Sequence, residues 1–146
     1  MPVELKTILL AEDNPKDVEL ILEALAEHNL ANQVLVVKDG VEAMEYLRCE
    51  GNFRLRRPGK PAVVLLDIKM PRMDGIEVLR AIRSDPALKT LPVVMLTSSR
   101  EEQDLIKSYE LGINAYVVKP VDFKEFIEAV KHIGIFWAVV NELPPE

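Results

Sequence analysis

Three short apolar runs in this chain end directly in polar or charged side chains. The runs and the residues that follow them are 8–11 before Glu12 and Asp13, 62–66 before Asp67, and 116–118 before Lys119. Continuous apolar runs of this length are typical of strands buried on both faces of a parallel sheet. In open parallel α/β sheets, ligands bind at the carboxyl ends of the strands. The sequence therefore predicts three carboxylates and one ammonium group at a single edge of a sheet.

Strand-like and helix-like segments alternate five times, which is the pattern of stacked βαβ units. The expected strands are 8–11, 34–37, 62–66, 93–96 and 115–118, each followed by an amphipathic helical segment. This pattern predicts a flavodoxin-like (βα)5 fold, a doubly wound parallel five-stranded sheet with strand order 2-1-3-4-5. We expect one domain over residues 1–140 and a C-terminal tail over 141–146.

Helix boundaries carry recognisable signals. Asn14 before Pro15 predicts an N-cap followed by proline in the first turn, and Asp39 predicts the start of a helix that runs to about residue 48. Ser99 with Glu102 has the form of a capping box, in which each residue's side chain bonds the backbone N–H of the other. Other expected boundaries are a stop at Asp85–Pro86, an end at Leu111–Gly112, a cap at Asp122, and an apolar stripe through Ile133.

Composition excludes several classes of protein. The formal net charge is −6, which disfavours non-specific binding to nucleic acid, and the hydrophobic fraction of 49% indicates a globular chain. Cys49 is the single cysteine, so no disulfide framework is expected. No apolar stretch reaches the roughly 18 residues of a membrane span, and the first residues do not resemble a signal peptide. We therefore expect a cytoplasmic protein without a membrane anchor.

The acids at the strand ends suit a magnesium ion. Mg2+ prefers oxygen ligands in octahedral geometry and keeps several waters, so one or two carboxylates suffice. Asp13 and Asp67 are expected on adjacent strands, and Glu12 is long enough to reach the ion through water. The backbone carbonyl of Lys69, just beyond the strand, is a further candidate ligand.

The same group of residues suits phosphoryl transfer. A carboxylate can act as a nucleophile toward phosphorus and form an aspartyl-phosphate, and we assign this role to Asp67. Such a transfer needs positioning and charge neutralisation more than covalent help. Besides the cation, the ammonium of Lys119 and the hydroxyl of Thr97 at the end of the fourth strand are expected to supply it.

These residues resemble the CheY-like receiver domains of two-component response regulators over about residues 5–135. The resemblance makes Glu12 and Asp13 the metal-binding acids and Asp67 the phospho-acceptor. It makes Thr97 the switch hydroxyl and Tyr116 the switch aromatic. Further matches are Met70–Pro71, Asp74–Gly75 and Lys119–Pro120, whose peptide bond is expected to be cis. The implied function is a signalling phospho-acceptor whose switching surface lies on the fourth helix, fifth strand and fifth helix.

A narrower resemblance is to single-domain regulators that pair with bacterial phytochromes. It is carried by the extended connection 51–61 and by the segment that ends in Phe136 and Trp137. The implied partners are a sensor histidine kinase and a downstream protein target or phosphotransfer protein. The apolar C-terminal segment predicts a homodimer through the switching face, with Phe136 and Trp137 in its interface.

Three alternatives remain open from the residues alone. A haloacid-dehalogenase-type phosphatase also uses an aspartate nucleophile, but it needs an acid two residues later, where this chain has Lys69. A dinucleotide-binding module would carry a glycine-rich loop after the first strand, and none is present. A degenerate receiver would bind partners without phosphorylation, which the complete set of site residues disfavours. The effect of Lys69 and Ser99 on phosphoryl lifetime is left open.

Overall fold

The computed structural model of the protein describes residues 7–26, 34–56, 59–108 and 115–132. Its strands are β1 (Ile8–Ala11), β2 (Val34–Val37), β3 (Val63–Asp67), β4 (Val93–Thr97) and β5 (Ala115–Val118). Neighbouring strands pair in parallel, and their order across the sheet is β2-β1-β3-β4-β5. The expected flavodoxin-like α/β fold and strand order are confirmed.

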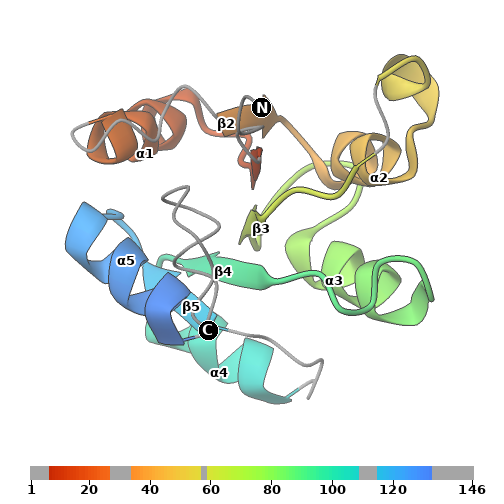
Figure 1. The fold of residues 1–146 in the computed structure, drawn as a ribbon. Helices are drawn as coiled ribbons and strands as arrows, with labels where there is room; N and C mark the ends of the chain where they lie inside the picture. Colours follow the sequence, from red (N-terminus) through yellow and green to blue (C-terminus); the bar gives the residue numbers. More distant parts are fainter. Residues whose placement is uncertain (1–6, 27–33, 57–58, 109–114, 133–146) are drawn as a thin grey trace, which may run out of the picture.

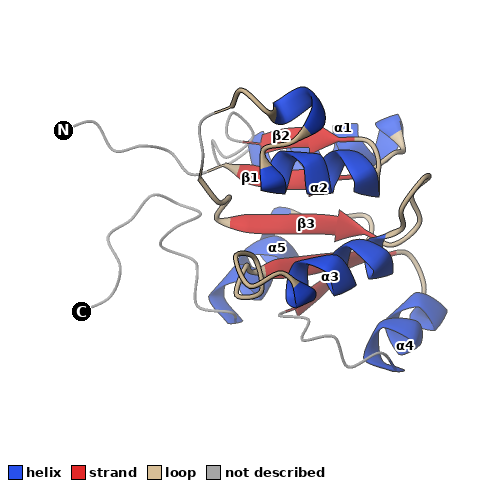
Figure 2. Ribbon diagram, turned by 90° about the vertical axis from the view of Figure 1, so that its right-hand side faces the viewer, coloured by secondary structure: helices blue, strands red, loops and turns tan. Residues whose placement is uncertain are grey.

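Helices cover both faces of this sheet. They are α1 (Pro15–Ala26), α2 (Gly40–Arg48), α3 (Gly75–Ser84), α4 (Arg100–Ser108) and α5 (Phe123–His132), with a short 3-10 helix, η2 (Gly51–Phe53), after α2. Figure 1 shows α1 and α5 on one side of the sheet and α2 and α3 on the other. In Figure 2, β1, β2 and β3 run in one direction, and α4 lies on the side of β3 away from β1. No helix among the described residues is long and apolar enough to cross a membrane.

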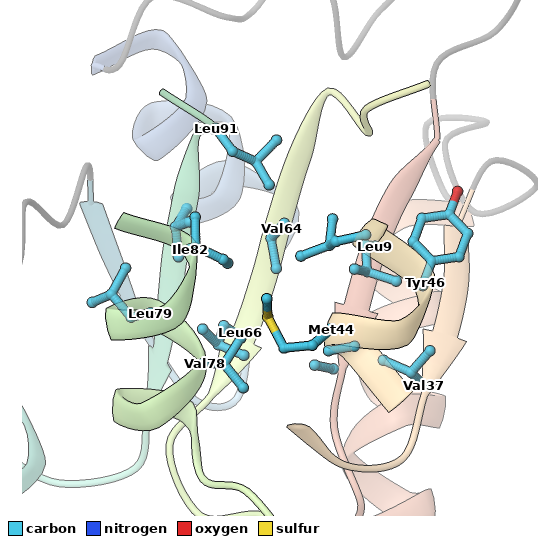
Figure 3. Close-up of a cluster of buried hydrophobic side chains, with 14 of the residues drawn as sticks. Leu9, Val37, Met44, Tyr46, Val64, Leu66, Val78, Leu79, Ile82 and Leu91 are labelled. Carbon is cyan, nitrogen blue, oxygen red and sulfur yellow. The ribbon is translucent and has the colours of Figure 1, made fainter. Parts of the chain in front are cut away.

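The sheet is buried between two apolar clusters because successive strand residues point to opposite faces. Leu9 and Val64 face α2 and α3, whereas Leu10 and Leu65 face α1 and α5, and all four are fully buried. Figure 3 shows the first cluster, in which Met44 of α2 packs among aliphatic side chains of the sheet and α3. Burial on both faces explains why β1 and β3 have no polar residue before their last position.

Most capping predictions are confirmed. The Oδ1 atom of Asn14 accepts hydrogen bonds from the backbone N–H groups of Lys16 (2.9 Å) and Asp17 (3.3 Å). Asp39 accepts from the backbone of Glu42 at 2.8 Å. Likewise, the side chain of Asp122 accepts from the backbone of Glu125 at 2.7 Å. As expected, α3 ends just before Asp85.

The predicted capping box at α4 is only half formed. Ser99 Oγ accepts from the backbone N–H of Glu102 at 3.2 Å, as expected. The carboxylate of Glu102, however, accepts from both the N–H (2.8 Å) and the hydroxyl (2.6 Å) of Ser98. Two donors on Ser98 outweigh the single N–H that Ser99 would offer. A complete capping box occurs instead at α3, between Asp74 and Glu77.

Several predictions concern residues outside the described part of the chain. They are the helix end at Leu111–Gly112, the stripe position Ile133, and the proposed interface residues Phe136 and Trp137.

Candidate functional site

The carboxyl ends of the strands meet at one cleft of about 390 Å³. In the β1–β3 pair, Ala11 is opposite Leu66, so Glu12 and Asp67 follow at the same level of the sheet. The lining residues are Glu12, Asp13, Asn14, Pro15, Asp17, Asp67, Lys69, Ser98, Glu102 and Lys119. The sheet register therefore brings together the acids and the lysine that the sequence placed at strand ends.

Three carboxylates in this cleft form a group that can hold a metal ion. One oxygen atom each of Glu12, Asp13 and Asp67 lies within 4.8 Å of the others. Glu12 and Asp67 are buried, while Asp13 is exposed at the mouth of the cleft. Carboxylate oxygens are the ligands that hard divalent cations prefer, so the residues present fit such an ion.

Lys119 joins the acids from the carboxyl end of β5, at the same edge of the sheet. Its Nζ lies 2.9 Å from Glu12 Oε2, 3.0 Å from Asp67 Oδ1 and 3.1 Å from Asp17 Oδ2. An ammonium group has three protons, so these three contacts use its whole donor capacity. Lys119 is thereby held directly beside Asp67, where it can neutralise charge that develops there.

Sequence reasoning did not identify Asp17 as a site residue. Asp17 lies in the first turn of α1 and accepts from Lys119, 102 residues away. In a capping box its carboxylate would bond the backbone N–H of Asn14, but Glu12 accepts from that group at 3.2 Å. The only signal in the sequence was an acid three residues after a predicted N-cap, which is common in helices that bind nothing.

Burial and charge shift the pKa values of the network. Burial raises the pKa of Glu12 from 4.5 to about 7, and the neighbouring Asp67 carboxylate adds to the shift against the opposing hydrogen bond from Lys119. Burial likewise raises the pKa of Asp67, again opposed by Lys119. Burial lowers the pKa of Lys119, but its hydrogen bonds and charge interactions with Glu12 and Asp67 outweigh this and raise it overall. Lys119 therefore keeps its proton more firmly than a free lysine, whereas Glu12 binds a proton at a higher pH than a free glutamate.

The predicted switch residues lie on β4 and β5. Thr97 is fully buried, and its Oγ1 has no hydrogen-bond partner within the described part of the chain. Tyr116 is 37% exposed on β5, so its ring is not packed inside the protein. The peptide bond between Lys119 and Pro120 is cis, as predicted. The Lys119 N–H also donates to the Thr97 carbonyl at 2.7 Å, which ties the two strand ends together.

Two further cleft residues were not expected to belong to the site. Ser98 and Glu102 line the same cleft as Asp67, and their mutual hydrogen bonds hold the start of α4 against the end of β4. Lys69 also lines the cleft, in agreement with its expected place beside Asp67. Ser99, by contrast, caps α4 and is not among the lining residues.

Several known proteins with similar structures are response regulators. The chain is 58% identical to the bacteriophytochrome response regulator RtBRR, with a TM-score of 0.87, over 97% of this chain and 85% of that one. The phosphorylated cyanobacterial phytochrome response regulator RcpA is 42% identical, with a TM-score of 0.74, over 98% and 100% of the two chains.

A third relative is the response regulator Rcp1 of Synechocystis sp. (strain ATCC 27184 / PCC 6803 / Kazusa). It is 38% identical over 139 residues, which cover 95% of this chain and 93% of that protein. A structure of the Mn(2+)-bound form of Rcp1 matches with a TM-score of 0.72 and 37% identity, over 97% and 99% of the two chains.

The family model of the response regulator receiver domain matches residues 8–131. This range includes all five strands and every helix described above except the last residue of α5. The rival interpretations as a phosphatase or a dinucleotide-binding module are thereby excluded. The chain is a signalling phospho-acceptor module, with an acidic cluster suited to a divalent cation, and not a classical enzyme. It belongs to the family of response regulator receiver domains.

Proposed function

We propose that this protein accepts a phosphoryl group on Asp67 from the phosphohistidine of a sensor histidine kinase, in a reaction that depends on Mg2+. The observation that carries the proposal is the position of the Lys119 ammonium, 3.0 Å from Asp67 and 2.9 Å from Glu12. A buried carboxylate with a fixed ammonium beside it, and metal-binding acids around it, is equipped to react with an anionic phosphorus centre.

In this mechanism an oxygen of Asp67 attacks phosphorus while the bond from phosphorus to the histidine nitrogen breaks. Glu12, Asp13, Asp67 and the carbonyl of Lys69 would hold Mg2+, which neutralises charge on the phosphoryl oxygens when bound. Lys119 supplies the second positive charge. It already contacts Asp67, so little rearrangement of its side chain is needed before the reaction.

The proposed output is a shift between two conformations. Among the described residues the buried hydroxyl of Thr97 has no hydrogen-bond partner, and a phosphoryl oxygen on Asp67 would give it an acceptor. Movement of Thr97 toward the phosphoryl group would leave space for Tyr116, whose exposed ring can then turn inward. This shift would alter the surface formed by α4, β5 and α5.

The decisive test is phosphorylation of Asp67→Asn, which keeps the shape of the side chain and removes the nucleophile. Wild type incubated with acetyl phosphate and Mg2+ should gain one phosphate by intact mass, and the variant should gain none. Asp104→Asn is the control, because Asp104 is exposed on α4 and does not line the cleft. Phosphate gain by the Asp67 variant would show that the acceptor is another residue.

The identity of the cation can be tested separately. We propose Mg2+, with modest affinity, because few protein ligands hold a mostly hydrated ion. Calorimetric titration with Mg2+, Mn2+ and Ca2+ should show binding that requires Asp13. The proposal for Mg2+ would be wrong if phosphorylation were supported by Mn2+ or Ca2+ and not by Mg2+.

Partners and context follow from the relatives. Similarity to phytochrome response regulators supports a phytochrome-type histidine kinase as the donor. We propose that residues 1–140 act as one receiver domain with a tail at 141–146, and that the signal passes to a protein target or phosphotransfer protein. Histidine kinases are phosphorylated from ATP, so we place the reaction in the cytoplasm. Phosphotransfer from purified candidate kinases, compared by rate, would identify the donor.

We further propose a two-fold homodimer that uses the face from β4 to α5. Tyr116 and Val118 on this face are 37% and 42% exposed. Phe136 and Trp137 are the candidate anchors, although they lie outside the described residues. Light scattering should give a dimer mass for wild type and a monomer mass for the Phe136→Ala, Trp137→Ala double variant. A monomeric wild type, unchanged by phosphorylation, would refute the dimer.

A further inference from the structure

One arginine ties together two loops at the carboxyl edge of the sheet. Arg72 lies five residues after Asp67, in the β3–α3 loop. Its Nε donates to Asp39 Oδ2 at 2.9 Å, and its Nη2 donates to Asp39 Oδ1 at 3.0 Å. Asp39 is buried and also caps α2. A two-pronged contact of this kind fixes orientation as well as distance.

Backbone contacts join the same two loops. The N–H of Gly40, the first residue of α2, donates to the Met73 carbonyl at 3.1 Å, and a Cβ at Gly40 would lie only 2.1 Å from that oxygen. At the other end of the β3–α3 loop, the Gly75 N–H donates to the Ile68 carbonyl at 2.8 Å. The loop that contains Lys69 is therefore closed on itself and held against α2.

Arg72 has an unusual backbone conformation. Its φ is 64°, in the left-handed region that side chains other than glycine, asparagine and aspartate rarely adopt. A residue persists in this region when its surroundings hold it there. Two contacts can do so: the Met73 N–H donates to the Pro71 carbonyl at 2.7 Å across Arg72, and the Arg72 side chain pairs with the buried Asp39.

We propose that Arg72 is a positioning residue for the cation site. By holding the β3–α3 loop against Asp39, Arg72 places the backbone carbonyl of Lys69 beside Asp13 and Asp67. The inference rests on the proposed function, which makes this carbonyl a cation ligand. It assigns to the Arg72–Asp39 pair a role in cation affinity beyond its contribution to stability.

Simple electrostatics and a positioning role predict opposite changes in cation affinity when Arg72 is removed. Arg72 is a positive charge near an acidic cleft, so its removal should strengthen the attraction for a cation. If Arg72 positions a ligand, its removal should weaken cation binding despite the more negative charge. The sign of the change in affinity therefore distinguishes positioning from charge.

The test compares Mg2+ affinity by calorimetry in wild type, Arg72→Asn, Arg72→Lys and Arg48→Asn. Asparagine tolerates positive φ, so Arg72→Asn removes the guanidinium without adding backbone strain. Arg48 is the matched control: it pairs with Asp85 at 3.3 Å and joins the opposite ends of α2 and α3. Both asparagine variants make the same change in net charge.

We expect the dissociation constant for Mg2+ to rise about tenfold in Arg72→Asn. This is the lower end of the range for loss of a residue that orients a metal ligand. The lower end applies because the Arg72–Asp39 pair is partly exposed. Arg72→Lys, which keeps the charge but not the two-pronged contact, should be intermediate, and Arg48→Asn should match wild type. Phosphorylation by acetyl phosphate should recover its full rate in Arg72→Asn at saturating Mg2+.

Unchanged or tighter binding in Arg72→Asn would overturn the inference, as would an equal loss in Arg48→Asn. If Arg72→Asn does not fold, unchanged Mg2+ affinity in Arg72→Lys would overturn it equally. Failure of the proposed function has a different signature, because wild type itself would then show no Mg2+ binding that depends on Asp13.

Discussion

Two parts of the carboxyl edge of the sheet, the acidic cleft and the neighbouring end of β4, differ in how their buried polar groups are satisfied. On the side formed by β1 and β3, Glu12 and Asp67 share the ammonium of Lys119. On the side formed by β4, the hydroxyl of Thr97 is buried without a partner in the described part of the chain. An unsatisfied buried group of this kind costs about 1–3 kcal/mol. The acidic side is thus already paired, whereas the hydroxyl side has a buried donor that, under the proposed function, a phosphoryl oxygen on Asp67 would satisfy.

Under the proposed function, this difference would let one edge of the sheet bind a cation and a phosphoryl group and also switch between two conformations. The charged side needs a stable arrangement, because a cation and a phosphoryl group must meet the same atoms each time. The hydroxyl side can gain a hydrogen bond in only one of two states, which is what a ligand-driven equilibrium requires. The following experiments test this division, from the largest expected effect to the smallest.

Cation binding and phosphorylation on the acidic side should depend completely on Asp13. Asp13→Asn removes one of the three clustered carboxylates, so we expect no measurable Mg2+ binding and no phosphate gain from acetyl phosphate. The control is Asp17→Asn, which makes the same charge change in the same cleft outside the three-carboxylate cluster. Cation binding should survive in Asp17→Asn. Equal losses in the two variants would mean that total charge, and not the cluster, determines affinity.

Lys119 should be the main stabilising residue of the paired side. Lys119→Met removes the ammonium and leaves Glu12 and Asp67 buried without their shared partner, which typically costs about 3–5 kcal/mol when a buried pair is broken. We expect the lower end of that range, because Glu12 can take up a proton. Urea unfolding without metal measures the change, and added Mg2+ should recover part of it. A loss below about 1 kcal/mol would show that the network contributes little to stability.

The acidic side should also make stability depend on pH. Burial raises the pKa of Glu12 from 4.5 to about 7, so between these values the folded protein binds more protons than the unfolded chain. The free energy of unfolding therefore falls as pH rises through this window. Without metal, the melting temperature should be several degrees lower at about pH 8 than at about pH 5.

Two comparisons show whether Glu12 causes this slope. Glu12→Gln should flatten it, because the amide does not titrate, and Mg2+ should reduce it in wild type by compensating the charged carboxylates. A metal-free protein that becomes more stable toward pH 8 would contradict the assignment, as would a slope that persists unchanged in the variant.

On the hydroxyl side, removal of the polar group should raise stability, whereas removal of the Lys119 ammonium should lower it. Thr97→Val keeps the shape of the side chain and removes the unsatisfied hydroxyl, so the unphosphorylated protein should become more stable by about 1 kcal/mol. Thr97→Ser keeps the hydroxyl and should not gain stability. Urea unfolding tests this pair of variants. Destabilisation by valine would mean that the hydroxyl already has a partner.

Much of this site could be predicted from the sequence because its residues follow buried strands. A run such as Val63 to Leu66 has to lie inside a sheet, and parallel packing then puts Asp67 at the same edge as Glu12 and Lys119. The caps at Asn14 and Asp39 were equally predictable, since each bonds a backbone group two or three residues away.

Contacts between side chains far apart in the sequence could not be predicted. Asp17 contacts Lys119 across 102 residues, and Arg72 contacts Asp39 across 33 residues. No local sequence pattern predicts either pair. Glu102 was expected to bond Ser99 and instead bonds Ser98. Several acceptors lay within reach of each donor, and the choice depended on how the helices packed on the sheet.

The sequence alone determined the strand pattern, the edge at which the acids gather, and the chemistry that this edge can perform. These features depend on hydrophobic period and on residue type at strand ends, which are local properties of the chain. Tertiary structure decided which carboxylates share Lys119, that the Thr97 hydroxyl meets no partner in the described segments, and that Arg72 bonds Asp39. Those features depend on side-chain geometry between segments far apart in sequence, which becomes defined only when the sheet and its helices are packed together.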